Sequence, residues 1–344
     1  MKEKPTRRES ILALALLGVL AAVGVGALVS EAEATGPGKN GKIAFRRYFD
    51  DAHTWGAIFV SNADGTGSRQ VTRPPRGVFD DYPDWSPNGS LLVFQRSGSP
   101  FAVYTVKRDG SRLTRVSPPC SASGPDIETK CEDGGSASFL PDGRHVVYTR
   151  ATGTVRHFPN WDQIEHSDIV VRDLDGANPR VLIRSRPFGG DQLSPQFSPD
   201  GSRFVYERVN SPLSNPAHRR ALFVVNADGS RQRQLTPWRM NAGDGADWSP
   251  DGSRILFRSQ LDTGRQSQLY TIRPDGTDLR RVTSFRKGTL LLSASFSPDG
   301  QRIVFSKAGR GGKADVFVMR ADGTRIRPIT QTALWDSAPD WGAR

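Results

Sequence analysis

The sequence is poor in cysteine, methionine and histidine, with 2 Cys, 3 Met and 5 His among 344 residues. It has no Cys-x-x-Cys spacing, which argues against a cysteine-based metal site or a dithiol active site. Cys120 and Cys131 instead enclose a short polar loop. In an oxidising compartment such a pair forms a disulfide by default. We therefore predict a Cys120–Cys131 disulfide that stabilises the fold by about 2–3 kcal/mol through loop closure.

Acidic residues are also in deficit, since 36 Asp and Glu stand against 47 Lys and Arg, giving a net charge of +11. The arginines are scattered through turns and strands rather than clustered. Arginine also outnumbers lysine, and such an excess often reflects the base composition of the genome. Outside the cytoplasm, this charge would favour an anionic polysaccharide. We expect no nucleic-acid partner.

One uncharged run, Ile11–Val29, follows four basic residues near the N-terminus. This pattern is typical of a secretory signal, with Ala32-Glu33-Ala34 as the cleavage site. The run also approaches the length of a membrane span, so an uncleaved N-terminal anchor is the alternative, and the only membrane contact that we expect. We predict residues 1–34 as signal or anchor, 35–40 as a short linker and 41–344 as the folded domain, located outside the cytoplasm as a periplasmic, secreted or membrane-anchored protein.

The rest of the chain is a repeat. Hydrophobic residues make up 36% of the sequence, which excludes a disordered chain, and 35 Gly with 24 Pro are too many for a helical bundle. Five copies of an aromatic-x-Pro-Asp/Asn-Gly hairpin occur at 83–94, 137–148, 195–206, 246–257 and 294–305. Their anchor aromatics, which we expect in the core between repeats together with Trp341, are Trp85, Phe139, Phe197, Trp248 and Phe296.

A second signature, an Asp-Gly turn between two apolar runs, follows each hairpin. Both turns are typical of tight β-hairpins, so each repeat is predicted to form four short antiparallel strands, the blade of a propeller. Residues 41–72 lack a first strand, and residues 336–342 form a first strand with nothing after it. The sequence therefore predicts an all-β fold: a six-bladed β-propeller closed by the C-terminal strand joining the N-terminal blade.

The repeated DWSPDG and NADG signatures resemble the propeller repeats of the TolB family and of prolyl-oligopeptidase-type peptidases, over about residues 41–342. The Gly-x-Ser-x-Gly elbow of the peptidases' hydrolase domain does not occur. The resemblance implies a non-catalytic scaffold, which we expect to be a monomer that binds a protein or peptide partner in the cell envelope.

Strand order places the tight turns on one face and all insertions on the other, here called the loop face. The first strand of each blade is innermost and begins at the loop face. Residues four to six positions before each anchor aromatic should therefore surround the channel mouth: Asp80, Asp81, Asp133, Asp191, Asp244 and Asp336. Converging carboxylates suit a divalent cation such as calcium or manganese, or a basic or polyhydroxylated ligand. The alternative is that they cap strand starts by bonding backbone groups.

The loop-face insertions hold candidate binding residues: Trp55, His53, His157, Phe158, Trp161, His166 and His218. If the insertion at 151–166 folded back on itself, a metal could be held by His157, Asp162, Glu165 and His166. The aromatic side chains would grip a peptide or sugar, or simply pack the loops onto the ring. A metal-assisted carbohydrate lyase or hydrolase is thus the alternative to the binding scaffold.

Overall fold

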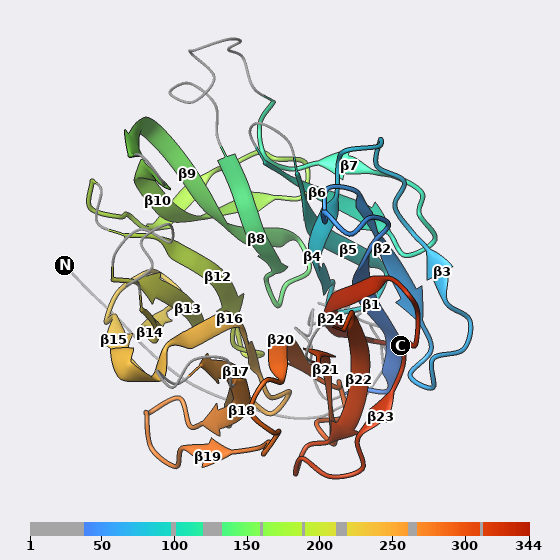
Figure 1. Ribbon diagram of the computed structural model, residues 1–344. Coiled ribbons are helices and arrows are strands. Elements are labelled where there is room, and N and C mark those ends of the chain that lie inside the picture. Colours follow the sequence, from blue (N-terminus) through green and yellow to red (C-terminus); the bar gives the residue numbers. More distant parts are fainter. Residues whose placement is uncertain are drawn as a thin grey trace, which may run out of the picture. The chain divides into compact units, whose positions relative to one another are not determined.

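The computed structural model describes residues 38–97, 101–119, 133–158, 161–187, 190–210, 219–260, 267–309 and 312–344, with the backbone alone at residues 133, 154–158 and 161–165. Within these ranges the chain forms six four-stranded sheets, the blades of a ring (Figure 1). This arrangement confirms the predicted six-bladed β-propeller. No helix in the described part of the chain has the length and apolar character needed to cross a membrane.

Each blade runs from its innermost to its outermost strand. Blades 1 and 2 contain β24 (Trp335–Ala343), β1 (Asn40–Tyr48), β2 (Gly56–Ser61) and β3 (Arg69–Gln70), then β4 (Asp80–Trp85), β5 (Leu91–Arg96), β6 (Ala102–Lys107) and β7 (Thr114–Arg115). Blades 3 and 4 contain β8 (Asp133–Phe139), β9 (His145–Phe158), β10 (Trp161–Asp173) and β11 (Arg180–Ile183), then β12 (Gln192–Phe197), β13 (Arg203–Val209), β14 (Arg220–Asn226) and β15 (Arg233–Gln234). Blades 5 and 6 contain β16 (Ala242–Trp248), β17 (Ile255–Gln260), β18 (Ser267–Ile272) and β19 (Arg280–Arg281), then β20 (Leu290–Phe296), β21 (Arg302–Ala308), β22 (Ala314–Arg320) and β23 (Arg327–Pro328). A 3₁₀ turn, η2 (Trp238–Met240), connects blades 4 and 5.

The ring is closed by pairing between the two ends of the folded domain. β24 pairs antiparallel with β1, with Trp341 opposite Ile43 and Asp336 opposite Arg47. The innermost strand of blade 1 therefore comes from the C-terminal end of the chain and its other three strands from the N-terminal end, as predicted.

The Asp-Gly turns fit closely against the neighbouring blade. Gly323, in the turn from β22 to β23, has a φ of +84°, a conformation that costs glycine little. A Cβ at this position would lie 2.1 Å from the carbonyl oxygen of Val282 in the preceding blade. The glycine thus serves both the turn and the seam between blades 5 and 6.

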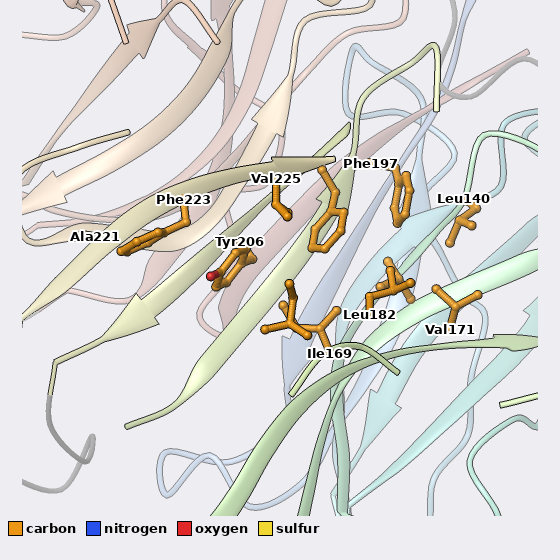
Figure 2. Close-up of a cluster of buried hydrophobic side chains, with 12 residues drawn as sticks. Leu140, Ile169, Val171, Leu182, Phe197, Tyr206, Ala221, Phe223 and Val225 are labelled. Carbon is orange, nitrogen blue, oxygen red and sulfur yellow. The ribbon is translucent and has the colours of Figure 1, made fainter. Parts of the chain in front are cut away.

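The core consists of side chains packed between neighbouring blades. Figure 2 shows one such cluster, in which Ile169 and Val171 of blade 3 face Phe197, Tyr206 and other residues of blade 4. All six predicted anchor aromatics are at least 94% buried, which confirms their place in the core: Trp85, Phe139, Phe197, Trp248, Phe296 and Trp341. Each blade therefore depends on its neighbour for burial of its apolar surface.

Every innermost strand contains a register shift two to four residues before its anchor aromatic. In five blades a non-glycine residue near the shift has positive φ: Tyr82, Ser136, Ser194, Asp244 and Ala338. An extra residue of this kind bends a strand and redirects its side chains. These bulges bring polar side chains into the channel.

The insertion at 151–166 was expected as a loop, but the structure extends β9 to Phe158 and begins β10 at Trp161. Strand pairing in blade 3 therefore continues to the tip of this insertion. The predicted disulfide residues Cys120 and Cys131, the candidate His218 and the predicted signal segment 1–34 lie outside the described residues, so those interpretations stay predictions.

Candidate functional site

The channel contains a cavity lined by the innermost strands of all six blades. Its volume is about 100 Å³, enough for a few water molecules or the end of one side chain. Four carboxylates line it. Three of them form no ion pair in the described residues and are here called the cavity carboxylates: Asp84 from β4, Asp247 from β16 and Asp340 from β24. The remaining polar lining is uncharged except for Asp244, and includes Ser138, Gln196 and Ser295.

The three cavity carboxylates also link adjacent blades. Asp340 accepts a hydrogen bond from the backbone N–H of Trp85 at 2.9 Å, so blade 1 is joined to blade 2. Asp84 accepts one from Phe139 at 2.8 Å, and Asp247 accepts one from Phe296 at 2.6 Å. Each acceptor therefore satisfies the N–H of an anchor aromatic in the next blade.

Burial makes these carboxylates hard to ionise. It raises the pKa of Asp84 and of Asp340, and for Asp84 the nearby Asp340 charge acts in the same direction. Burial, with the Asp340 charge second, raises the pKa of Asp247 to about 7. Like charges sharing a desolvated site disfavour one another's ionised forms. The cavity is therefore poised to hold protons near neutral pH or to receive a positively charged group.

Arginines pair with the predicted mouth carboxylates. Arg96 donates two hydrogen bonds to Asp80, at 2.6 and 2.9 Å, and Arg47 donates two to Asp336, at 2.7 and 2.8 Å. In both pairs the two residues lie directly opposite each other in neighbouring strands. Such cross-strand pairs of opposite charge stabilise a sheet.

The other mouth carboxylates show a similar pattern where they are described. Asp81 pairs with Arg46, and Asp244 pairs with both Arg220 and Arg258. Asp191 directly precedes β12 and is half-buried, whereas the side chain of Asp133 lies outside the described residues. Four of the six predicted aspartates thus form ion pairs, and ligand binding by the six stays a prediction.

Two of the loop-face candidates pack against the ring. His53 stacks on Tyr48 with 4.5 Å between ring centroids and contacts Trp335 at 4.6 Å. Burial and the nearby Arg46 and Lys313 charges lower the pKa of His53. Trp55 packs on Phe49 at 4.7 Å. The loop at 46–56 is therefore held in place by aromatic contacts.

The predicted metal ligands lie on the β9–β10 hairpin. His157 is opposite Asp162 in the strand pairing, whereas His166 is opposite Thr152. The side chains of His157, Phe158, Trp161, Asp162 and Glu165 lie outside those described, so their joint action on a metal or ligand stays a prediction. Elsewhere, in the ranges that the structure describes, no three His, Cys, Asp or Glu side chains are grouped to hold a metal ion.

Sequence reasoning missed the cavity carboxylates although a signal for them exists. Each of the three tryptophan anchors is directly preceded by aspartate, in Asp84-Trp85, Asp247-Trp248 and Asp340-Trp341. The predicted mouth residues lie four to six positions before the anchor, so this signal falls outside that prediction. The bulge places the residue next to the anchor in the channel as well.

The Arg47–Asp336 pair provides a test of the mouth geometry. The Arg47 guanidinium also lies 4.6 Å from the centroid of the Phe59 ring. Lysine carries the charge but cannot form the two parallel hydrogen bonds. Arg47→Lys is therefore expected to lower the free energy of unfolding by about 1–2 kcal/mol in urea titrations. Arg76→Lys, at an exposed position, is the matched control, and an equal loss in both variants would contradict a specific role for the pair.

Comparison with known proteins agrees with this architecture. The chain is 32% identical over 128 residues to Dipeptidyl-peptidase 5 from Porphyromonas endodontalis, covering 37% of this chain and 17% of that protein. It is 35% identical over 152 residues to Protein TolB homolog from Chlorobium luteolum, covering 42% of this chain and 30% of that protein. The matched regions are thus less than a third of the length of these two relatives.

Among solved structures, TolB from Acinetobacter baumannii matches with a TM-score of 0.66 at 18% identity, covering 88% of this chain and 67% of that one. At this identity the likeness concerns the fold. The family model described as the TolB beta propeller domain matches residues 159–344, more than half of the chain. The chain belongs to the family of TolB β-propeller domains.

Proposed function

We propose that this protein is an exported, non-catalytic propeller that binds a protein or peptide partner in the cell envelope through its loop face and channel mouth. Membership of the TolB propeller family supports a role in the envelope. The basic and apolar N-terminal segment supports export. The observation that carries the proposal is the cavity between the innermost strands, with its three half-buried carboxylates.

The chemistry of the cavity selects the part of the partner that enters it. Asp84, Asp247 and Asp340 each keep at least one backbone N–H donor, yet burial still raises their pKa values. A cation in the cavity would favour their ionised forms. The partner therefore presents a lysine side chain or a free amino terminus, held by charge-assisted hydrogen bonds.

The channel mouth would accept such a segment from the loop face. Tyr82 is 38% exposed and lies in the lining between the mouth and Asp84. Its ring offers an apolar surface together with a polar hydroxyl, a combination typical of binding sites. The aromatic loop at 46–56 stands beside the same opening, since His53 contacts Trp335 at the start of β24.

The test uses the full-length chain and fluorescent decapeptides that differ only in charge: one with a free amino terminus and two lysines, and one acetylated with glutamines in their place. The first peptide is expected to bind more tightly than the second. The Asp84→Asn variant, which keeps an acceptor for the Phe139 N–H, is expected to bind the first peptide about tenfold more weakly than the parent protein. Asp64→Asn makes the same charge change in an exposed turn and should leave binding unchanged. Equal binding of both peptides, or an equal effect of both variants, would overturn the proposal.

A further inference from the structure

The outermost strands of the propeller carry a second feature, unrelated to the channel. The segments that contain them are 68–77, 111–119, 177–187, 230–240, 277–288 and 324–332. Together they hold 17 Lys and Arg but one acidic residue, Asp278. Sixteen of these cations are exposed, and Arg115 is half-buried. Arginines that look scattered in the sequence are therefore gathered by the fold on one structural layer, which we call the outer belt.

The outer belt follows the perimeter of the ring. β3, β7, β15, β19 and β23 lie at its outside in Figure 1, and each is the last strand of its sheet. The charge is thus carried on a curved wall around the domain. The carboxylates of the channel and its mouth lie on the innermost strands, at the opposite edge of every sheet.

Belt arginines are held in position by hydrogen bonds to neighbouring turns. Arg233 donates to the carbonyl oxygen of Asp275 at 2.9 Å, and Arg327 donates to that of Ala63 at 2.7 Å. Each bond crosses to the turn of the next blade. The charges are offset only in part. Hydrogen bonds from Thr66, and with a smaller effect the Arg327 charge, lower the pKa of Asp64. Hydrogen bonds from Thr277, and with a smaller effect the Arg273 and Arg233 charges, lower the pKa of Asp275. Among the belt cations, all of which lie in the described ranges, Arg280 alone forms an ion pair, with Asp278.

We propose that the outer belt is a binding surface for a linear acidic polysaccharide. A row of exposed cations in excess over the neighbouring carboxylates attracts a polyanion and releases the counter-ions that surround it. A flexible chain can follow the curved wall from one blade to the next. The belt is therefore a site separate from the channel, and its ligand is recognised mainly by charge.

Other polyanions fit the belt less well. Single-stranded nucleic acids stack their bases on exposed aromatic rings, but the belt aromatics Trp238 and Phe285 are half-buried and pack on Phe223 and Phe305. A duplex is read by a helix or ribbon inserted into a groove, whereas the one helix in the described ranges is the three-residue turn η2.

A membrane surface is disfavoured by geometry. The exposed apolar residues of the belt, Leu113, Leu279 and Ile326, belong to blades 2, 5 and 6. Because they are distributed around the ring, they do not form one patch, and single exposed apolar residues are normal on soluble surfaces. A flat bilayer would meet only part of the curved wall.

The test measures binding of the full-length chain to carboxymethyl-dextran and to unmodified dextran, which differ only in charge, over a series of salt concentrations. The belt variant R184Q/R186Q/R231Q removes three exposed arginines of blades 3 and 4 that form no side-chain bond in the described structure. The control R144Q/R302Q/R320Q removes three exposed arginines beside the tight turns. Both variants change the net charge equally.

We expect the protein to bind carboxymethyl-dextran and not unmodified dextran, with an affinity that falls steeply as the salt concentration rises. The belt variant should bind about tenfold more weakly and with a shallower salt dependence, and the control should bind like the parent protein. Absence of binding at low salt, or equal loss in both variants, would overturn the proposal. Binding confined to anionic lipid vesicles or to a single-stranded oligonucleotide, tested in parallel, would overturn it as well.

Discussion

Removal of residues 335–344 is expected to abolish cooperative folding of the domain. These residues form β24, which pairs with β1 and closes the ring. They also supply Trp341, which has no exposed surface, and Asp340, which bonds the Trp85 N–H. Truncating a buried tryptophan alone costs about 3–5 kcal/mol, and the deletion also leaves the edge of β1 unpaired. The combined loss is comparable to the whole stability of a typical domain.

Thermal unfolding followed by far-ultraviolet circular dichroism measures this effect. Adding the peptide 335–344 in excess should restore part of the transition, because a ligand that binds the folded state stabilises it by mass action. Deleting Arg344 alone, which lies beyond the strand, is the control. Cooperative unfolding of the truncated chain at the parent temperature would contradict the closing role of β24.

The sequence was sufficient to predict this closure because propeller geometry is encoded locally. Each Asp-Gly turn and each anchor aromatic recurs in the repeat, and the incomplete first and last repeats complement one another. Anchor burial followed from the same pattern. Local signals of this kind are sufficient when every blade repeats the same contacts with its neighbours.

The candidate site was harder to predict because it depends on contacts between repeats. The pairing of Asp80 with Arg96 and of Asp336 with Arg47 requires the exact strand register, which the repeat alone does not give. The bulges arise at dissimilar residues, such as Tyr82 and Ala338, so no single residue type marks them. The strands on both sides of the 151–166 insertion, β9 and β10, are 14 and 13 residues long. The described parts of the other repeats have no strands of this length.

The half-buried channel carboxylates make stability depend on pH in an unusual direction. Burial raises the pKa of Asp247 to about 7, above the value of about 3.9 expected in the unfolded chain. Between these values the folded state binds a proton that the unfolded state has released, so the free energy of unfolding falls as pH rises. For Asp247 this loss is on the order of 4 kcal/mol. Burial raises the pKa values of Asp84 and Asp340 as well, and their contributions have the same sign.

Substitution at Asp247 separates the charge from the hydrogen bond. The backbone nitrogen of Phe296 lies 2.6 Å from Oδ2 of Asp247. Asparagine keeps an acceptor for this N–H but cannot ionise. Asp247→Asn is therefore expected to stabilise the domain at about pH 8 and to flatten the dependence between about pH 5 and pH 8. Asp247→Ala removes the acceptor and should lose about 1–3 kcal/mol even at about pH 5.

Urea unfolding of the parent and both variants at these two pH values is the measurement. Asp64→Asn, in an exposed turn, controls for a general effect of one charge. If the Asn variant kept the parent's full pH dependence, Asp247 would not be the residue that binds the proton. An increase in the parent's free energy of unfolding between about pH 5 and pH 8 would contradict the predicted direction of the pH dependence. The channel carboxylates would then be stabilised as anions, by donors stronger than the three backbone N–H groups that link the blades.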